Sequence, residues 1–137
     1  MKASLLYRIS SILLVLFAIG HTLGFLQIDP KWGVDSLVQS MKSTHFNVSG
    51  AERTYWDFFV GFGLFVTALM LLASLIAWQF GSFPPETLAA MRFGAWGFVG
   101  CFAVVAYLSW RYFFIVPVVF SIAIFLCLAA AAWRSGG

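Results

Sequence analysis

The chain has 137 residues, of which 62% are hydrophobic, 19% aromatic and only 9% charged, and its mean hydropathy is +0.95. Because a soluble domain carries about 25% charged residues, this composition argues against a water-soluble globule and favours a protein surrounded by lipid. The formal net charge of +3 comes from scattered basic residues with no basic run, which disfavours nucleic-acid binding and needs no partner beyond anionic lipid headgroups.

Four segments are long and apolar enough to cross a bilayer, since a helix needs about 20 apolar residues for a hydrocarbon core of roughly 30 Å. We expect these spans at residues 4–26, 55–80, 85–110 and 112–133. Lys2 and Arg8 precede the first apolar run as in a secretory signal, but the apolar character continues to Leu26, so we interpret this segment as a span. The expected fold is all-α, a four-helix transmembrane bundle in one domain covering residues 1–137.

The long connection between the first two spans, residues 27–54, is expected to contain a short amphipathic helix. Asp29 and Pro30 have the pattern of a helix N-cap followed by proline at the first helical position. Apolar residues then recur at helical spacing, namely Val34, Leu37, Val38 and Met41. This helix would lie on the membrane surface or cap the bundle.

The end of this connection predicts that the helix of the second span begins ahead of the span itself and extends beyond the membrane. Ser49 and Glu52 have the spacing of a capping box, so we expect the helix to start near Gly50. Its outer end would then carry Glu52, Arg53 and Asp57. Arg53 and Asp57 would be four residues apart on one helical face, the spacing of a surface ion pair.

The third span carries small residues at helical spacing, which are Ala90, Gly94, Gly97 and Cys101. Such a stripe lets a neighbouring helix approach closely in lipid, and Gly61 and Gly63 have the same potential on the second span. The stripe supports one hypothesis for function, a non-enzymatic accessory or scaffold subunit. It would dock a partner or a second copy of the chain, as in a homo-oligomer.

Short turns join the later spans, so these helices must run antiparallel to their neighbours. Pro117 either kinks the fourth span or starts it, and in the second case residues 112–116 form an irregular interfacial segment. The basic residues divide equally between the two membrane sides. We expect both termini in the cytoplasm, because the first span often dominates orientation and acidic residues in 27–54 offset the bases there.

His21 is the strongest candidate for a functional residue. It lies about one turn inside the end of the first span, next to the long connection. An ionisable group at that depth needs a partner or a water-filled pocket, and it therefore indicates a functional site. The alternative is a structural imidazole hydrogen-bonded to a carbonyl of the loop, with Gly20 and Gly24 leaving room for a neighbour.

Further polar and aromatic residues map by topology to the same end of the bundle as His21. We predict that Asp57 acts with His21 as a catalytic pair. The predicted ligand-binding residues are His45, Arg53, Tyr55, Trp56, Trp110 and Arg111. The two arginines would hold a polar or anionic head. Each residue alone also has a structural explanation, as a surface ion pair, an exposed histidine or part of an aromatic belt.

Three sharper functions are less well supported. A b-type haem between His21 and His45 would need both imidazoles at one depth, and only His21 lies in an expected span. A metal site of His21, His45 and Asp57 lacks a close ligand pair. A channel or proton path would need more polar residues at several depths. No hydrolase, zinc-protease or nucleotide-binding motif occurs in the chain.

The hydropathy pattern, with Gly20-His21-Thr22-Leu23-Gly24 before the long connection and Tyr112-Phe113-Phe114-Ile115-Val116-Pro117 late in the chain, resembles the small DoxX-like bacterial membrane proteins. The resemblance covers the whole chain as a pattern of spans. It implies the architecture and a bacterial origin, and hence an inner-membrane location. It carries over no catalytic residue.

The residues therefore predict a membrane protein that binds or transforms a lipophilic small molecule. Its pocket would lie between the first and second spans, covered by the loop helix. His21 would be the hydrogen-bonding or acid–base group. The sequence names no cofactor.

Overall fold

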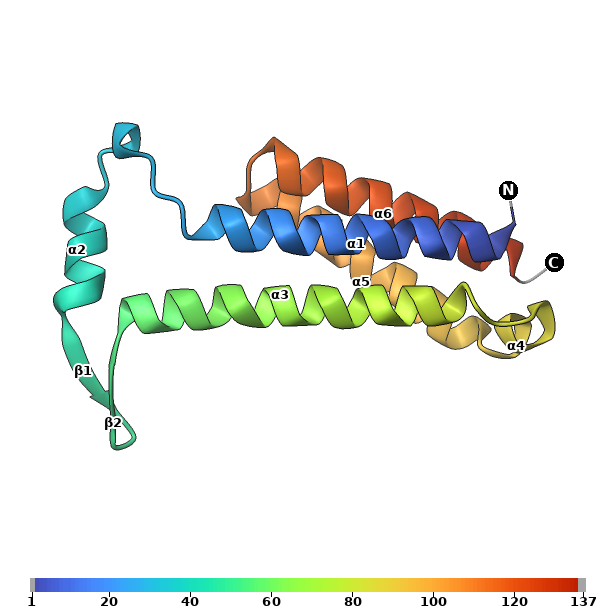
Figure 1. The fold of residues 1–137 in the computed structure, drawn as a ribbon, viewed down its shortest axis with the longest axis horizontal. Coiled ribbons are helices and arrows are strands. Elements are labelled where there is room, and N and C mark those ends of the chain that lie inside the picture. Colours follow the sequence, from blue (N-terminus) through green and yellow to red (C-terminus); the bar gives the residue numbers. More distant parts are fainter. Residues whose placement is uncertain (1, 136–137) are drawn as a thin grey trace. The chain divides into compact units, whose positions relative to one another are not determined.

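The computed structural model describes residues 2–135, and its regular structure is mainly helical (Figure 1). Four helices are long and apolar enough to cross a membrane, which are α1 (Ala3–Phe25), α3 (Tyr55–Phe80), α5 (Arg92–Tyr112) and α6 (Ile115–Arg134). Only 11% of the most apolar stretch of α3 is buried. Lipid must cover such a surface, so the chain is an all-α, multi-pass integral membrane protein, as predicted.

The chain forms two compact units. The first contains the residues up to 17 and from 70 onward, and the second contains residues 18–69. Both α1 and α3 contribute residues to each unit.

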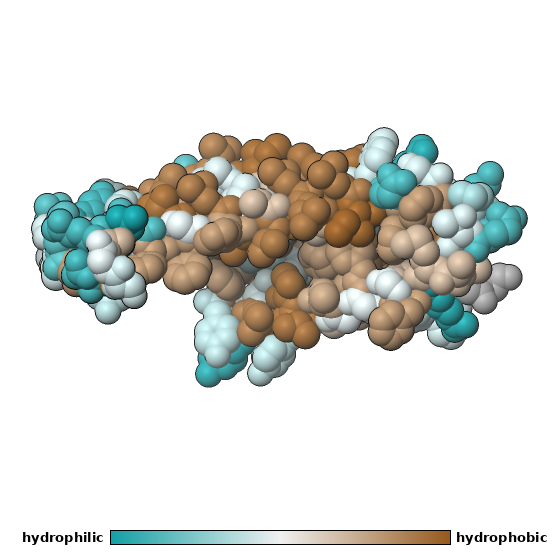
Figure 2. All heavy atoms as spheres, turned by 90° about the horizontal axis from the view of Figure 1, so that it is seen from below, coloured by the Kyte–Doolittle hydropathy of each residue, from teal (hydrophilic) through white to brown (hydrophobic). Residues whose placement is uncertain are grey.

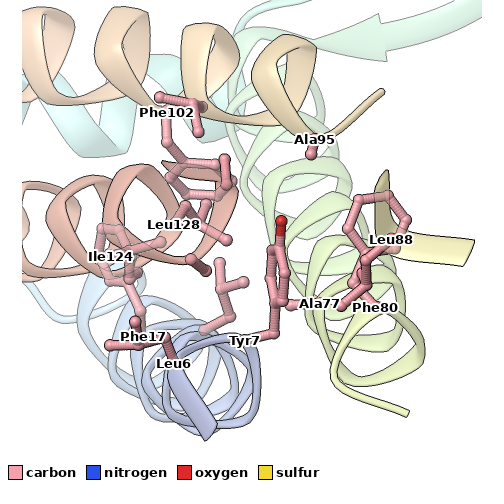
Figure 3. Packing of buried hydrophobic residues seen from close by; sticks show 14 residues of the cluster. Leu6, Tyr7, Phe17, Ala77, Phe80, Leu88, Ala95, Phe102, Ile124 and Leu128 are labelled. Atoms are coloured by element: carbon pink, nitrogen blue, oxygen red, sulfur yellow. The ribbon is translucent and has the colours of Figure 1, made fainter. Parts of the chain in front are cut away.

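The first unit has one buried core, to which α1, α3, α5, α6 and the short helix α4 (Pro85–Ala90) all contribute. Figure 3 shows Tyr7 of α1 beside Phe80 of α3, whose rings meet edge to face at 5.4 Å. Phe102 of α5 and Leu128 of α6 complete the same core. Burial of these apolar side chains and close helix packing hold this unit together.

Two hydroxyl groups also join α1 to α3 within the first unit. The Oγ atoms of Ser11 and Ser74 are 2.9 Å apart, and Ser74 Oγ also donates to the Ser11 carbonyl at 3.0 Å. Both side chains are buried, so each hydroxyl finds its partner on the opposite helix rather than in water.

The second unit joins the end of α1 to the start of α3 through four short elements. These are the 3₁₀ helix η1 (Pro30–Trp32), α2 (Asp35–Ser43) and the antiparallel strands β1 (His45–Val48) and β2 (Ala51–Thr54). Figure 1 shows α2 lying crosswise to the ends of α1 and α3. Figure 2 shows hydrophilic residues gathered on this connection and hydrophobic residues over the neighbouring helices. The arrangement suits a membrane surface.

The prediction that the helix of the second span begins near Gly50, ahead of the span limits 55–80, was wrong. Ser49 and Gly50 form the turn of the hairpin with φ angles of 51° and 89°, and Asn47 Oδ1 accepts a hydrogen bond from Gly50 N at 3.0 Å. Consecutive positive φ angles suit a tight hairpin turn, in which a glycine is favoured. The helix begins at Tyr55, after a second sequence of capping-box type, Thr54 to Asp57.

The predicted amphipathic helix divides in two at Gly33, which has a φ of 65°. Asp29 caps η1 as expected, since its Oδ1 accepts a hydrogen bond from Lys31 N at 2.9 Å. The left-handed conformation at Gly33 ends this first turn, and α2 begins only at Asp35.

The third and fourth spans also differ from their predicted limits. Residues 85–90 form α4, and Met91 separates it from α5, so the third membrane helix begins at Arg92 instead of residue 85. Pro117 lies in the first turn of α6 and therefore starts that helix rather than kinking it. The missing N–H of proline costs nothing there, because N–H groups in the first turn have no intrahelical acceptor.

Candidate functional site

His21 lies half-buried on α1 and makes a hydrogen bond to α3 within the second unit. Its Nε2 is 3.1 Å from the carbonyl oxygen of Gly63, and its ring stacks on Phe25 at 5.1 Å and 19°. A carbonyl only accepts, so Nε2 must carry a hydrogen. The acceptor belongs to the facing helix and not to the loop. No hydrogen bond to Nδ1 is found among residues 2–135.

Gly63 is required where the two helices meet. A Cβ at this position would lie 2.6 Å from Phe25 Cδ2 and 2.7 Å from Phe25 Cζ, far inside van der Waals contact. A Cβ at Gly61, Gly20 or Gly24 would instead meet no heavy atom within 4 Å. Of the glycines expected to admit a neighbouring side chain here, only Gly63 does so.

A pair of threonines continues the contact between α1 and α3. The Oγ1 atoms of Thr22 and Thr67 are 2.8 Å apart. Thr22 Oγ1 also donates to the Ala18 carbonyl at 2.8 Å, and Thr67 Oγ1 lies 3.2 Å from the Gly63 carbonyl. When the Thr22 hydroxyl donates to the Ala18 carbonyl, the Thr67 hydroxyl can donate to Thr22 Oγ1. The Gly63 oxygen then keeps a lone pair that accepts the hydrogen bond from His21. Both hydroxyl hydrogens are then used within the helix pair.

An aromatic row extends from His21 toward the amphipathic helix. It consists of the rings of His21, Phe25, Phe59 and Trp56, in that order, with Lys42 beyond Trp56. The Phe25 and Phe59 centroids are 5.9 Å apart, and those of Phe59 and Trp56 are 5.3 Å apart. Lys42 Nζ lies 4.4 Å from the Trp56 ring, a cation–π contact. Phe59 is 41% exposed, so the row has a face open to lipid.

Asp57 caps the start of α3. Its Oδ2 accepts a hydrogen bond from Thr54 N at 2.8 Å, and Thr54 Oγ1 accepts one from Asp57 N at 3.1 Å. These reciprocal bonds satisfy backbone donors that a helix start would otherwise leave free. No contact between Asp57 and His21 is found in the described part of the chain, so the two are not seen as an acid–base pair.

Arg53 does not pair with Asp57 as the sequence suggested. Arg53 lies on β2, before α3 begins, so the two residues are not four apart on a helix. Its Nη1 donates to the Glu52 carbonyl at 2.6 Å. The expected ion pair was wrong because the helix starts later than predicted.

The other predicted residues of the second unit also have local partners. His45 Nδ1 lies 3.3 Å from Glu52 Oε1, and these side chains are 57% and 75% exposed, so the pair contributes little to stability. Tyr55 packs on Phe46 at 4.9 Å. Within residues 2–135, no group of three or more His, Cys, Asp or Glu side chains is placed to hold a metal ion.

Trp110 and Arg111 lie at the end of α5 in the first unit. Trp110 is 68% exposed and lies 6.1 Å from the Tyr107 ring, and the Arg111 guanidinium lies 5.3 Å from the Tyr112 ring. Exposed aromatic residues beside a cation at the end of a membrane helix are typical of the headgroup region.

Comparison with family models, with characterised proteins and with solved structures found no match. The site itself is a histidine whose Nδ1 has no hydrogen bond within the described part of the chain, and it lies beside an aromatic row.

Sequence reasoning missed the residues that hold His21 in place. Thr22 and Thr67 are hydroxyl residues inside two spans, and their presence was a signal that these spans meet there. Lys42 was not among the predicted site residues. Its contact with Trp56 depends on how α2 crosses the start of α3.

Proposed function

We propose that this membrane protein binds a lipophilic small molecule at His21. The observation that carries the proposal is the state of the imidazole, in which Nε2 is hydrogen-bonded to Gly63 and Nδ1 has no hydrogen-bond partner among residues 2–135. A ring nitrogen without a hydrogen bond is costly in hydrocarbon, so a polar group of a ligand would be favoured there. Because the Asp57 carboxylate already caps α3, we propose binding rather than catalysis as the role of this site.

The aromatic row supports a ligand with an apolar body. Phe25 and Phe59 offer ring surface beside His21, and the exposed part of Phe59 faces the region that lipid occupies. Apolar ring contacts and one hydrogen bond together are the usual composition of a small-molecule site. We further propose a bacterial inner-membrane location with cytoplasmic termini, which rests on the DoxX-like hydropathy pattern and on the first span.

The proposal predicts a ligand that copurifies with the protein. Native mass spectrometry of the protein in lipid nanodiscs should detect a lipophilic adduct on the wild type. In the His21→Ala variant the amount of bound adduct should fall about tenfold, because the substitution removes the hydrogen bond and the ring contact together.

His45→Ala is the matched control, because it removes an exposed histidine whose side chain contacts Glu52. It should retain the adduct, and circular dichroism should show unchanged helix content in both variants. Equal adduct occupancy in His21→Ala and the wild type would contradict binding at His21.

A second candidate function, assembly through α5, is favoured by the packing of its small residues. Gly94, Gly97 and Cys101 are exposed, and a Cβ at Gly97 would meet no heavy atom within 4 Å. The buried face of α5 is formed instead by Ala95, Val99 and Phe102. Ala90 belongs to α4, so the stripe is shorter than predicted. In lipid, an open stripe of this kind favours contact with another helix.

Assembly through this face predicts that Gly97→Leu lowers the oligomeric fraction by about tenfold, because a bulky side chain prevents close helix approach. The fraction can be measured as Cys101–Cys101 crosslinking in membranes, with Cys127 replaced by alanine. Gly20→Leu is the control, since Gly20 on α1 is also open and should leave crosslinking unchanged. Monomeric wild-type protein in the membrane would exclude this second function.

A further inference from the structure

The hydrogen bond between His21 and Gly63 determines where the imidazole hydrogen lies. Nε2 donates to the Gly63 carbonyl, so a neutral imidazole has its lone pair at Nδ1. Nδ1 is thus an acceptor, and no described residue donates to it. The polar group that this atom recognises must be a hydrogen-bond donor.

The neighbouring hydroxyl groups offer no spare donor that would suit an acceptor ligand. Thr22 and Thr67 bond to one another, and their remaining contacts are the Ala18 and Gly63 carbonyls. Both hydroxyl hydrogens are therefore donated to acceptors on α1 or α3. A ketone, ester or carboxylate would find no free donor among these groups.

The aromatic row indicates the chemistry of the rest of the ligand. His21 stacks on Phe25, and Phe25 and Phe59 lie ring to ring at 5.9 Å. Aromatic rings favour other rings in offset or edge contacts. A planar ring that carries the donor could contact Phe59 and still reach His21, whereas an aliphatic alcohol would gain less from these surfaces.

We propose that the ligand of this site is a lipophilic phenol, that is, an aromatic ring with a hydroxyl donor and an alkyl chain. The proposal rests on the function proposed above and adds the ligand class. The phenol hydroxyl donates to His21 Nδ1, the ring lies along the aromatic row, and the alkyl chain extends into lipid.

The test compares two probes that differ only in the donor, 4-decylphenol and 4-decylanisole. Their affinities for the intact protein in detergent micelles can be measured from ligand-dependent shifts in thermal unfolding at fixed probe-to-detergent ratios. We expect the phenol to bind about tenfold more tightly than its methyl ether, the effect of one hydrogen bond. This comparison needs no variant and so does not depend on the folding of one.

The His21→Gln variant then tests whether the preference for the phenol depends on Nδ1. The glutamine amide nitrogen replaces Nε2 and can still donate to Gly63, but the side chain offers no acceptor at the Nδ1 position. We expect the tenfold preference for the phenol to disappear in His21→Gln and to persist in His45→Gln.

Each contrary outcome has a distinct meaning. Equal binding of the two probes to the wild type would overturn the assignment of the ligand as a phenol. If the copurifying adduct were nevertheless lost in His21→Ala, the proposed function, binding of a lipophilic molecule at His21, would still stand. Tighter binding of 4-decylbenzoate than of 4-decylphenol would show that Nδ1 carries a hydrogen and would overturn it as well. A phenol preference retained in His21→Gln would place the donor contact elsewhere and would also overturn the assignment.

Discussion

Replacing Gly81 with valine is expected to lower the free energy of unfolding by about 3 kcal/mol, the upper end of the usual cost of overpacking. A Cβ at this buried position would lie 2.9 Å from the Ser4 carbonyl oxygen and 2.9 Å from Arg8 Cγ, and 3.3 Å from the Trp78 carbonyl oxygen. The Arg8 side chain can move aside. The backbone oxygens cannot move without shifting the first turns of α1 and the end of α3.

The loss can be measured by titration with dodecyl sulfate in mixed micelles, followed by far-UV circular dichroism. Gly20→Val is the control, because its Cβ meets no heavy atom within 4 Å. Adding Arg8→Ala to Gly81→Val should recover only part of the loss, since the Ser4 oxygen remains in the way. Full recovery would show that Arg8 alone is the obstacle, and an unchanged stability in Gly81→Val would contradict the close approach itself.

Replacing Gly63 with valine is expected to lower the free energy of unfolding by about 1–3 kcal/mol and to abolish the ligand binding that we propose at His21. The new side chain would occupy the place of the Phe25 ring, which packs directly over Gly63. Because His21 stacks on Phe25 and bonds to Gly63, displacement of that ring also disturbs the imidazole.

Gly61→Val provides a matched comparison on the same helix, with the same change in side chain and no heavy atom within 4 Å of its Cβ. The difference between the two variants in the same titration gives the cost of the contact with Phe25. In a Phe25→Ala background, Gly63→Val should cost little more than Gly61→Val, since the obstructing ring is absent. A full loss in that background would assign the cost to another neighbour.

Much of the fold could be predicted from the sequence, because the length of an apolar run is a local property. The second span was placed at the limits that α3 has, and the first within one residue of α1 at each end. Helix boundaries were less predictable where two capping signals compete. Ser49 with Glu52 and Thr54 with Asp57 have the same spacing, and the helix uses the second pair because the first pair lies in a hairpin.

The candidate site was only partly predictable. His21 was recognised because an ionisable side chain inside an apolar run is exceptional. Its partner Gly63 was recognised only as a small residue, since residues 42 positions apart meet through the register of α1 against α3. A long connection does not determine that register, which side-chain packing and hydrogen bonding decide.

By itself, the sequence determined that this protein spans a membrane four times and that His21 lies inside the first span. The physical reason is that hydropathy acts on each segment independently of the others. Only the tertiary structure decided that His21 donates to Gly63, that Asp57 caps α3, and that an aromatic row reaches from His21 to Lys42. These contacts depend on residues distant in the chain meeting at one register, and composition carries no information about that register.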